Sequence, residues 1–511
     1  MPPKRKHPSK FHHQPVSTCP HTILTLHPSP HATTINYKGP TPRQRSSALS
    51  TPGSNSDPHL KGLNDYPGIQ CFPAPLILPD DDLADDPTYP PQSLTSWMRG
   101  KWRNEVTDKR RTLYVISPPR IEEGLGEIGM RIGMESLVEQ LTGQAEGKGK
   151  KLRDVKEPGA EDVVQYLQAF YHGLPVKLFP QEDAEFTTWN SGSSSNSSQK
   201  RPRRRGKCDG SAIALRHKSS LTRIRTRSKN SIHQLNLDDL LDAAIEMVPP
   251  DAYAVLMLVS QDLYQSADDE FVCGMAIGGS RVCVVSMARY NPDLDGVMQV
   301  EREHAWPASH CLSYVNGCCE DEGGEEVRPV KKQKKARTQV KHIPHNSDTT
   351  TCENLPTLHE RPLNAAVQTH ISLPPISAAS SPTSITNLWL SRVCRTASHE
   401  LGHCFGFDHC VYYACNMNAS ASIREDPRQA PYLCPVDLEK VRRVTGTGVD
   451  KWYESMVEYC EAEDRGDVHM FRALGGWCRA MMEVRKGDGG RSSSGVSGGG
   501  GGGKHDPITI D

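Results

Sequence analysis

The sequence predicts an α/β (α+β) fold in which a mixed, twisted sheet packs on one long helix, with long disordered insertions and tails. Apolar runs at residues 113–116 and 252–260 predict two buried strands. Apolar residues at helical spacing predict the long helix over residues 384–404. Gly (41) and Pro (39) make up about a sixth of the 511 residues, which indicates that much of the chain does not pack.

Composition argues against a global charged surface and against a membrane span. Lys plus Arg (60) and Asp plus Glu (61) nearly cancel to a net charge of -1, so no global basic surface for nucleic acid or anionic membrane is expected. The longest apolar run, residues 252–259, is far shorter than the roughly 20 residues that a membrane-spanning helix needs. The N-terminus is basic without an apolar stretch, so we expect a cytoplasmic or nuclear protein that is not secreted.

The first half of the chain divides by composition. Residues 1–95 are rich in Pro, Ser, His and Thr and are predicted to be a disordered tail. Residues 96–188 are predicted to be the N-terminal part of the core, with a strand from Leu113, a helix over 161–171 and a strand over 176–179. Residues 189–231 are Ser-rich and then densely basic, which predicts a linker or, alternatively, a nuclear-import or nucleic-acid patch.

Residues 232–300 are predicted to form the central strands. The helix over residues 237–248 is expected to end at Pro249-Pro250, and the strand over 252–260 follows directly. Two further strands, at 271–275 and 281–290, flank Gly278-Gly279, which predicts a hairpin.

The second half of the chain also alternates between segments predicted to be ordered and segments predicted to be disordered. Residues 301–383 are polar and include a basic run at 331–337, so they are predicted to be a low-complexity insertion. Residues 384–482 are predicted to hold the long helix, capped by Ser384 or Thr386, and C-terminal helices at 438–444 and 449–459. Residues 483–511 are predicted to be a flexible Gly-rich tail.

One motif at the end of the long helix carries candidate chemistry. In HELGHCFGFDHC, His399 and His403 are four residues apart and therefore share one helix face. Gly406 can take a left-handed conformation, so the chain can reverse and bring His409 to the same point. Three imidazoles leave the fourth tetrahedral position open, which favours catalytic over structural zinc. The alternative, a run of surface histidines, does not account for the fixed offsets of Gly406 and His409.

Glu400 is adjacent to the first histidine but lies on a different side of the helix. It is therefore a poor candidate for a zinc ligand and a good one for a general base, because zinc lowers the pKa of a bound water to about 7.

A second group of candidate ligands follows directly. Cys410, Cys415 and Cys434 are soft ligands at short loop spacing, which favours a structural zinc. Asp437 lies at the C-x-x-C offset from Cys434 and is the candidate fourth ligand, although three thiolates with one carboxylate is a less usual set than four thiolates. The alternative is that the three cysteines are ordinary small core residues.

These residues resemble a known family. HELGHCFGFDHC followed by Met417 resembles the metzincin signature, and more closely the archaemetzincins, in which Cys follows the third His, then C-x-M, then a Cys pair containing Cys-Pro. The resemblance covers about residues 105–185 and 235–480. It implies a metzincin-like fold, catalytic zinc on the three histidines, Glu400 as base, Met417 as the Met-turn, and a second zinc on the cysteines. The family has Cys where this chain has Asp437.

The resulting hypothesis is a zinc-dependent metallopeptidase that hydrolyses peptide or protein substrates with a zinc-activated water. Aminopeptidase-like activity is suggested for some members of the family. We also hypothesise that residues 281–290 are an edge strand that pairs with extended substrate. The alternative function is a catalytically weak or inactive zinc-binding scaffold in the cell interior or nucleus. The basic runs at residues 200–207 and 331–337 leave nucleic acid open as a partner of such a scaffold. The presence of Glu400 argues against a scaffold, because metal binding alone does not require this residue.

Overall fold

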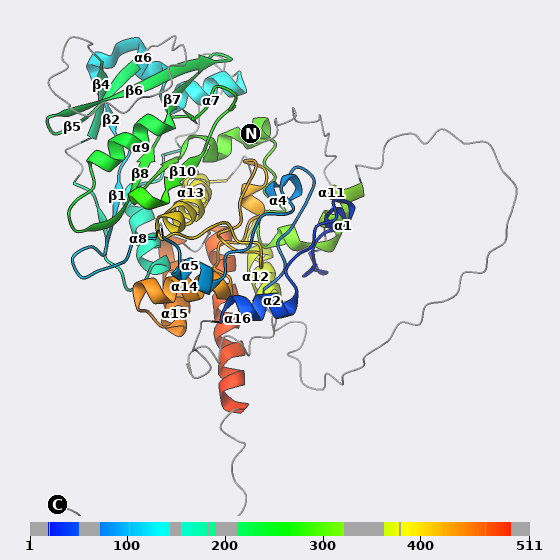
Figure 1. The fold of residues 1–511 in the computed structure, drawn as a ribbon. Helices are drawn as coiled ribbons and strands as arrows, with labels where there is room; N and C mark the ends of the chain where they lie inside the picture. Colours follow the sequence, from blue (N-terminus) through cyan, green and yellow to red (C-terminus); the bar gives the residue numbers. More distant parts are fainter. Residues whose placement is uncertain are drawn as a thin grey trace, which may run out of the picture.

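The computed structural model describes residues 19, 21–50, 72–101, 103–143, 155–180, 184–189, 212–320, 362–377, 380–465 and 467–491. The basic runs at 200–207 and 331–337 therefore lie outside the described residues. The chain folds as a mixed α/β structure with two mixed sheets and surrounding helices (Figure 1). Among the described helices, none is long and apolar enough to cross a bilayer.

The first sheet contains the strands that the apolar runs predict. Its order is β10-β11-β8-β1-β3, with parallel pairing throughout except between β10 and β11. The strands are β1 (Thr112–Ile116), β3 (Val176–Leu178), β8 (Ala252–Val259), β10 (Gly274–Ile277) and β11 (Val282–Ser286). Every residue of β8 is buried, which a central parallel strand covered on both faces requires.

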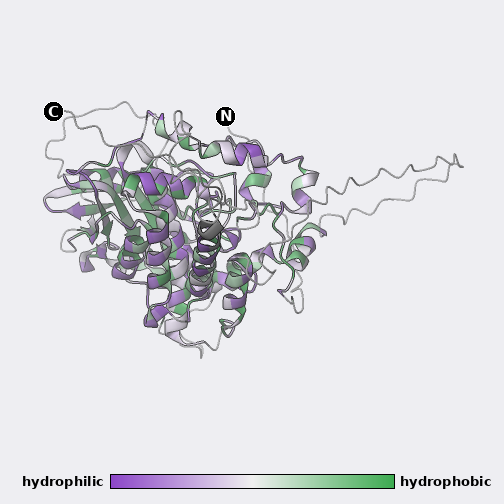
Figure 2. Cartoon of the chain, turned by 90° about the horizontal axis from the view of Figure 1, so that it is seen from below, coloured by the Kyte–Doolittle hydropathy of each residue, from purple (hydrophilic) through white to green (hydrophobic). Residues whose placement is uncertain are grey.

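Helices cover both faces of this sheet. Alternate residues of β8 point to opposite sides, so that Leu256 packs toward α8 (Ala160–Phe170) and α13 (Pro382–Cys404), while Met257 packs toward α9 (Leu237–Glu246). The predicted packing of the long helix on the sheet is confirmed by its contacts with β8, β10 and β11. Figure 2 shows that helices and strands alike carry both hydrophobic and hydrophilic residues.

The second sheet corrects the predicted linker over residues 189–231. Its order is β2-β4-β5-β6-β7-β9, and two of its longest strands fall within that range. The strands are β2 (Arg120–Ile121), β4 (Ala184–Thr188), β5 (Ala212–His217), β6 (Ser220–Lys229), β7 (Ile232–Asn236) and β9 (Leu263–Tyr264). The basic residues of β6 alternate with buried Ile224 and Thr226, a period of two that the high charge density obscures.

The predicted hairpin is confirmed, but the edge-strand hypothesis for residues 281–290 is wrong. β11 lies inside the sheet between β10 and β8, and β10 is the edge strand. The turn between them is a short 3-10 helix, Gly278–Ser280, followed by Arg281 with a positive φ of 65°. The chain reverses here, so the strand that comes first in sequence becomes the outer one.

The predicted disorder of residues 1–95 is wrong for the described parts of that range. They form α1 (Pro30–Thr34), α2 (Pro42–Ala48), α4 (Asp82–Asp85) and the start of α5 (Leu94–Met98). A few widely spaced apolar side chains suffice because they insert into the main core. Phe72, for example, is buried and packs edge-on against Tyr432 and Trp477.

The predicted insertion at 301–383 and the predicted tail from 483 are also partly helical. Before and after the undescribed residues 321–361 lie α11 (Leu312–Glu320) and α12 (Pro362–Ile371), and α12 packs on α16 (His469–Arg491). The remaining helices include the predicted C-terminal pair, as α14 and α15. They are α6 (Gly126–Arg131), α7 (Met134–Thr142), α10 (Asp295–Met298), α14 (Pro435–Thr445) and α15 (Val449–Cys460).

Candidate metal centres

The long helix α13 carries the histidine motif at its C-terminal end. Ser381 caps its start by accepting a hydrogen bond from the Ser384 backbone N–H at 3.1 Å, so the predicted caps, Ser384 and Thr386, lie inside the helix. The last three turns are almost entirely buried. The end of this helix is therefore a rigid support in the core, which suits a precisely spaced set of ligands.

The predicted turn after the helix is confirmed. Gly406 has a φ of 79°, and the Phe407 N–H returns to the Gly402 carbonyl at 3.1 Å. A side chain at Gly406 would be strained in this left-handed conformation. The reversal brings His409 back beside the helix, with its ring centroid 5.5 Å from that of His399 and 4.9 Å from that of His403.

The structure brings the three predicted histidines together. One ring nitrogen from each of His399, His403 and His409 lies within 4.8 Å of the others. Backbone carbonyls fix two of the rings, because Nδ1 of His399 faces the Asn416 oxygen at 2.7 Å and Nδ1 of His403 faces the Phe407 oxygen at 2.6 Å. A carbonyl can only accept, so each Nδ1 carries the proton and each Nε2 keeps a free lone pair.

This donor set fits a zinc ion. The Nε2 atoms of His399 and His403 are 3.1 Å apart, and both present lone pairs. Two nitrogens at about 2.0–2.1 Å from one tetrahedral ion would be about 3.3 Å apart. Burial lowers the pKa of all three imidazoles, to about 4 for His409, so the neutral form that binds metal is favoured.

Glu400 lies beside this group and is 8% exposed. Its carboxylate faces β10, because a Cβ added to Gly274 would lie 3.3 Å from the Glu400 Oε1. Burial raises the pKa of Glu400 to about 8; the nearby Arg395 opposes this rise and Asp426 adds to it. Arg395 and Asp426 form a buried ion pair of their own. A carboxyl group with such a pKa can both take up and release a proton near neutral pH.

Met417 lies against the helix that carries the histidines. A Cβ added to Gly402 would lie 2.5 Å from the Met417 sulfur and 3.3 Å from the Phe407 ring. Met417 is fully buried, and its carbonyl accepts a hydrogen bond from the Cys410 N–H at 2.7 Å. The side chain therefore fills the space that a glycine between the two helix histidines leaves open.

Replacing Gly402 with Ala is expected to lower the free energy of unfolding by about 1–3 kcal/mol, because the new methyl group overlaps the Met417 sulfur. The cost would exceed the small gain in helix propensity. Urea denaturation measures the change. Gly279→Ala is the matched control, since nothing lies within 4 Å of a Cβ at that position. Equal stability of the two variants would contradict the close packing of Met417 on the helix.

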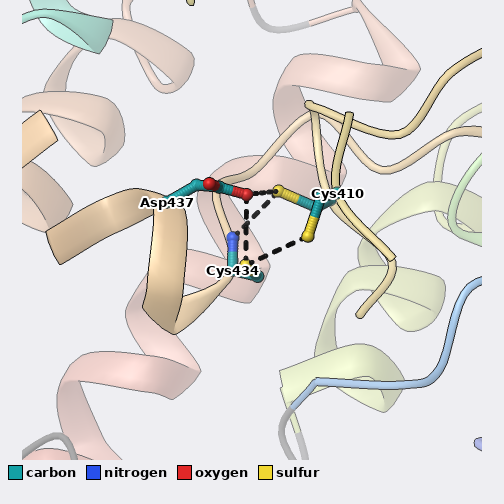
Figure 3. Close-up of side chains that lie close together, drawn as sticks. Cys410, Cys434 and Asp437 are labelled. Carbon is teal, nitrogen blue, oxygen red and sulfur yellow. Dashed lines mark hydrogen bonds between the residues drawn. The ribbon is translucent and has the colours of Figure 1, made fainter. Parts of the chain in front are cut away.

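The second predicted group also comes together. Donor atoms of Cys410, Cys415, Cys434 and Asp437 lie within 4.8 Å of one another, and all four residues are buried. The Cys410 and Cys434 sulfurs are 3.6 Å apart, and Asp437 Oδ2 is 3.3 Å from the Cys415 sulfur and 3.4 Å from the Cys434 sulfur (Figure 3). Two thiolates at about 2.3 Å from one tetrahedral ion would be about 3.8 Å apart. The geometry therefore fits a closed, four-ligand metal site.

The thiols and the carboxyl group have unequal pKa values in this cluster. Burial opposes the thiolate at Cys410, but hydrogen bonds from Cys415 and Cys434 outweigh it and lower the Cys410 pKa. Burial raises the pKa of Cys415 and Cys434. Burial also raises the pKa of Asp437 to about 6, which Lys440 opposes.

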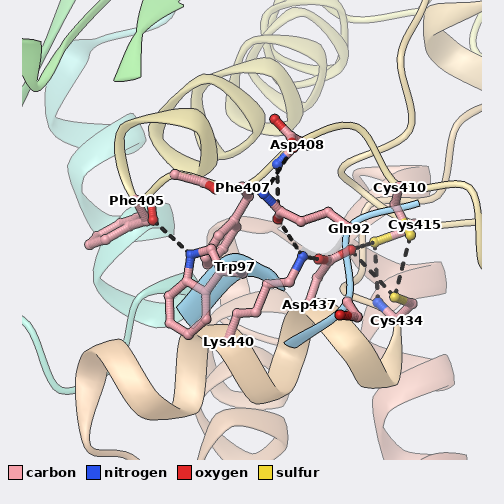
Figure 4. A network of polar contacts seen from close by, with 12 residues as sticks. Gln92, Trp97, Phe405, Phe407, Asp408, Cys410, Cys415, Cys434, Asp437 and Lys440 are labelled. Atoms are coloured by element: carbon pink, nitrogen blue, oxygen red, sulfur yellow. Dashed lines mark hydrogen bonds and ion pairs between the residues drawn. The ribbon is translucent and has the colours of Figure 1, made fainter. Parts of the chain in front are cut away.

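Two residues outside the predicted ligand set hold this cluster in place. Lys440 Nζ donates to Asp437 Oδ1 at 2.8 Å, and both side chains are 1% exposed. Lys440 also donates to the Gln92 Oε1 at 2.7 Å, while the Gln92 amide nitrogen donates to Gly406 O and to Asp408 Oδ2 (Figure 4). Gln92 therefore ties the loop between the two groups to α14. No pattern in the sequence marks Gln92, whereas Lys440 is one helical turn after Asp437.

Two asparagines beside Met417 were missed as well. The Asn416 side chain donates to Ser398 Oγ at 3.1 Å, in addition to the bond between its carbonyl and His399. The Asn418 amide donates to the Cys410 carbonyl at 2.7 Å and accepts from the Cys415 N–H at 2.7 Å. Their position on either side of Met417 was the available signal, because short amide side chains favour such local backbone bonds.

Comparisons with known proteins match the same region. A model described as peptidase family M54 matches residues 376–443. Archaemetzincin-2 of Homo sapiens is 23% identical over 394 residues, which are 76% of this chain and 75% of that protein. The archaemetzincin of Methanopyrus kandleri is 41% identical over 56 residues, 11% of this chain and 32% of that one. A crystal structure of the Methanopyrus kandleri protein covers 67% of this chain and 99% of its own, at 17% identity and a TM-score of 0.28.

Proposed function

Because the chain belongs to the archaemetzincin family, peptidase family M54, we propose that it hydrolyses peptide bonds with a zinc ion held by His399, His403 and His409. The observation that carries this proposal is the convergence of three imidazole nitrogens within 4.8 Å of one another. When bound, zinc supplies a Lewis acid that polarises the peptide carbonyl and makes water a nucleophile near neutral pH.

Groups of the protein itself would orient the zinc ligands and transfer the proton. The carbonyls of Asn416 and Phe407 keep the protons of His399 and His403 on Nδ1, so that both Nε2 atoms stay available. Glu400 would accept the proton of the attacking water at its carboxylate and pass it to the nitrogen of the leaving amine. Its burial supports this role, since water is largely kept from the group that carries the proton.

We infer that an extended substrate lies along β10. β10 is an edge strand of the sheet, and its Gly274 lies directly against the Glu400 carboxylate. An added strand would bond to the backbone of β10 and so place a peptide group next to the proposed base. Because Gly274 has no side chain, the backbone of β10, the backbone of a bound peptide and the Glu400 carboxylate can lie close together.

We further propose that Cys410, Cys415, Cys434 and Asp437 bind a second, structural zinc ion. Four protein ligands would leave no open position for substrate. The loop that carries Cys410 and Cys415 also supplies His409, and its Asn416 carbonyl orients His399. A metal in the second group would therefore hold the loop on which the first group depends.

Removal of metal from the full chain by a chelator is expected to abolish turnover of a broad peptide library. Turnover should return on addition of Zn²⁺, because the zinc ion that the three imidazoles would hold is the group that polarises the substrate carbonyl. Metal analysis of the same samples gives zinc per chain before and after. Peptide turnover that continues at zero zinc would rule out the proposed mechanism. Zinc bound with no turnover of any peptide would favour the scaffold instead.

A further inference from the structure

A third group of sulfur and imidazole side chains is separate from both centres described above and includes Cys311, which directly precedes α11. In the fold, α11 lies next to α1 (Figure 1). Donor atoms of Cys19, His21 and Cys311 lie within 4.8 Å of one another. Donor atoms of His21, Glu303 and His304 form a second such group, which shares His21. The two groups therefore adjoin at His21, and the second also includes the Glu303 carboxylate.

Backbone pairing brings the two halves of this cluster together. Leu24 forms an antiparallel bridge with Cys311, and the Thr25 N–H donates to the His310 carbonyl at 2.8 Å. The Cys19 sulfur lies 2.9 Å from the Ser313 hydroxyl on α11. Segments almost three hundred positions apart are thus aligned by their main chains, so the proximity of the thiols does not depend on a side-chain rotamer alone.

His304 is the member whose environment points to a missing ligand. It is 2% exposed, and its ring stacks between Tyr314, with centroids 4.1 Å apart, and His21, with centroids 5.3 Å apart. Its Nδ1 contacts the Glu301 carboxylate. Its Nε2 is buried and has no nitrogen or oxygen partner among the described residues, and the ring's remaining contact is a side-chain hydrogen bond with the Cys19 thiol.

A thiol is only a weak hydrogen-bond donor, so Cys19 alone satisfies this buried ring nitrogen poorly. A carboxylate on Nδ1 is the arrangement that usually orients a metal-binding histidine, because it fixes the proton there and leaves the Nε2 lone pair free. The hydrogen bond between Cys19 and His304 places a soft ligand directly beside this ring.

We propose that Cys19, His21, His304 and Cys311 bind a zinc ion. Two thiolates and two imidazoles are a usual set for tetrahedral structural zinc, and a full set of four leaves no position for substrate. Glu303 is exposed and is not needed to complete the coordination. The site is separate in residues from both centres described above and does not depend on peptidase activity.

Such an ion would fasten the N-terminal segment to α11. Cys19, Cys311 and Leu78 belong to one small apolar cluster, and clusters of this size bury little surface by themselves. A metal cross-link between the two segments would add stability that this packing lacks.

Zinc content of the purified full chain, measured by native mass spectrometry, tests the proposal. Wild type is expected to hold three zinc ions per chain, and Cys311→Ser and His21→Ala are each expected to hold two. Cys318→Ser is the matched control, because this cysteine belongs to the same apolar cluster but to neither ligand group. It should keep three zinc ions. His399→Ala should lose the ion of the proposed catalytic centre and keep the other two.

Three results would overturn the proposal. The first is wild-type protein with two zinc ions and a Cys19–Cys311 disulfide in non-reducing peptide maps. The second is three zinc ions in His21→Ala, which removes only a half-buried imidazole and so keeps the test valid should Cys311→Ser fail to fold. The third is an unchanged thiolate-to-metal absorption band when Co²⁺-loaded Cys311→Ser is compared with wild type.

Discussion

Replacing Glu400 with Gln is expected to reduce peptide turnover by about 10²- to 10⁴-fold, the usual contribution of a positioned general base. The amide has nearly the same shape as the carboxylate but cannot accept the proton of water. His399 and His403 do not depend on this side chain for their orientation, since backbone carbonyls hold them. Zinc content should therefore be unchanged, and kcat should fall more than KM rises.

Glu122→Gln is the matched control for this experiment. Glu122 is next to the second sheet, where it contacts Thr187 and Arg216, and it has no part in either proposed metal centre. Turnover by this variant should equal that of wild type. If Glu400→Gln turns over peptides as fast as the control does while its zinc is intact, the assignment of Glu400 as base is wrong. Parallel loss of zinc and turnover would instead indicate a structural role.

Replacing Lys440 with Met is expected to lower the free energy of unfolding by about 3–5 kcal/mol. Removal of one partner from a buried ion pair leaves the other charge uncompensated. Asp437 would lose the bond to its Oδ1, and Gln92 would lose its donor on α14. The methionine side chain keeps most of the aliphatic stem, so the change tests charge more than volume. Chemical denaturation of the metal-free protein measures it, because no zinc ion then compensates the Asp437 carboxylate.

Lys451→Met provides the comparison. Lys451 also forms an (i, i+3) pair, with Glu454, but its side chain is 67% exposed. Exposed pairs contribute about 0–1 kcal/mol, so this variant should be nearly as stable as wild type. We also expect Lys440→Met, but not Lys451→Met, to release zinc from the second centre at a lower chelator concentration. Similar stabilities for the two variants would contradict the role of Lys440.

The centre of the fold could be predicted because local patterns determine it. The short, all-apolar run of β8 indicates a strand by its length, and the apolar spacing of α13 indicates a helix by its period. The offsets of His399, His403 and His409 around Gly406 likewise predict a convergent group, which the structure brings together. In these cases the residues that decide the structure lie within one element or one turn of it.

The parts that could not be predicted depend on distant partners. Phe72 lies in a segment with little apolar periodicity and is buried because Tyr432 and Trp477 supply the surface it packs on. The strand pattern of β6 is masked by charge, and its pairing with β5 and β7 decides its conformation. The role of Gln92 could not be predicted for the same reason, since its hydrogen-bond partners are more than three hundred residues away in the sequence.

The position of Gln92 bears on the order in which the protein matures after synthesis. Its amide joins Gly406, Asp408 and Lys440, all of which leave the ribosome long after it does. Contacts of such high sequence separation form late, because the intervening chain must first be brought together. The hydrogen bonds of Gln92 can therefore form only after the C-terminal third of the chain has been synthesised, so we expect the segment that carries Gln92 to dock late in folding.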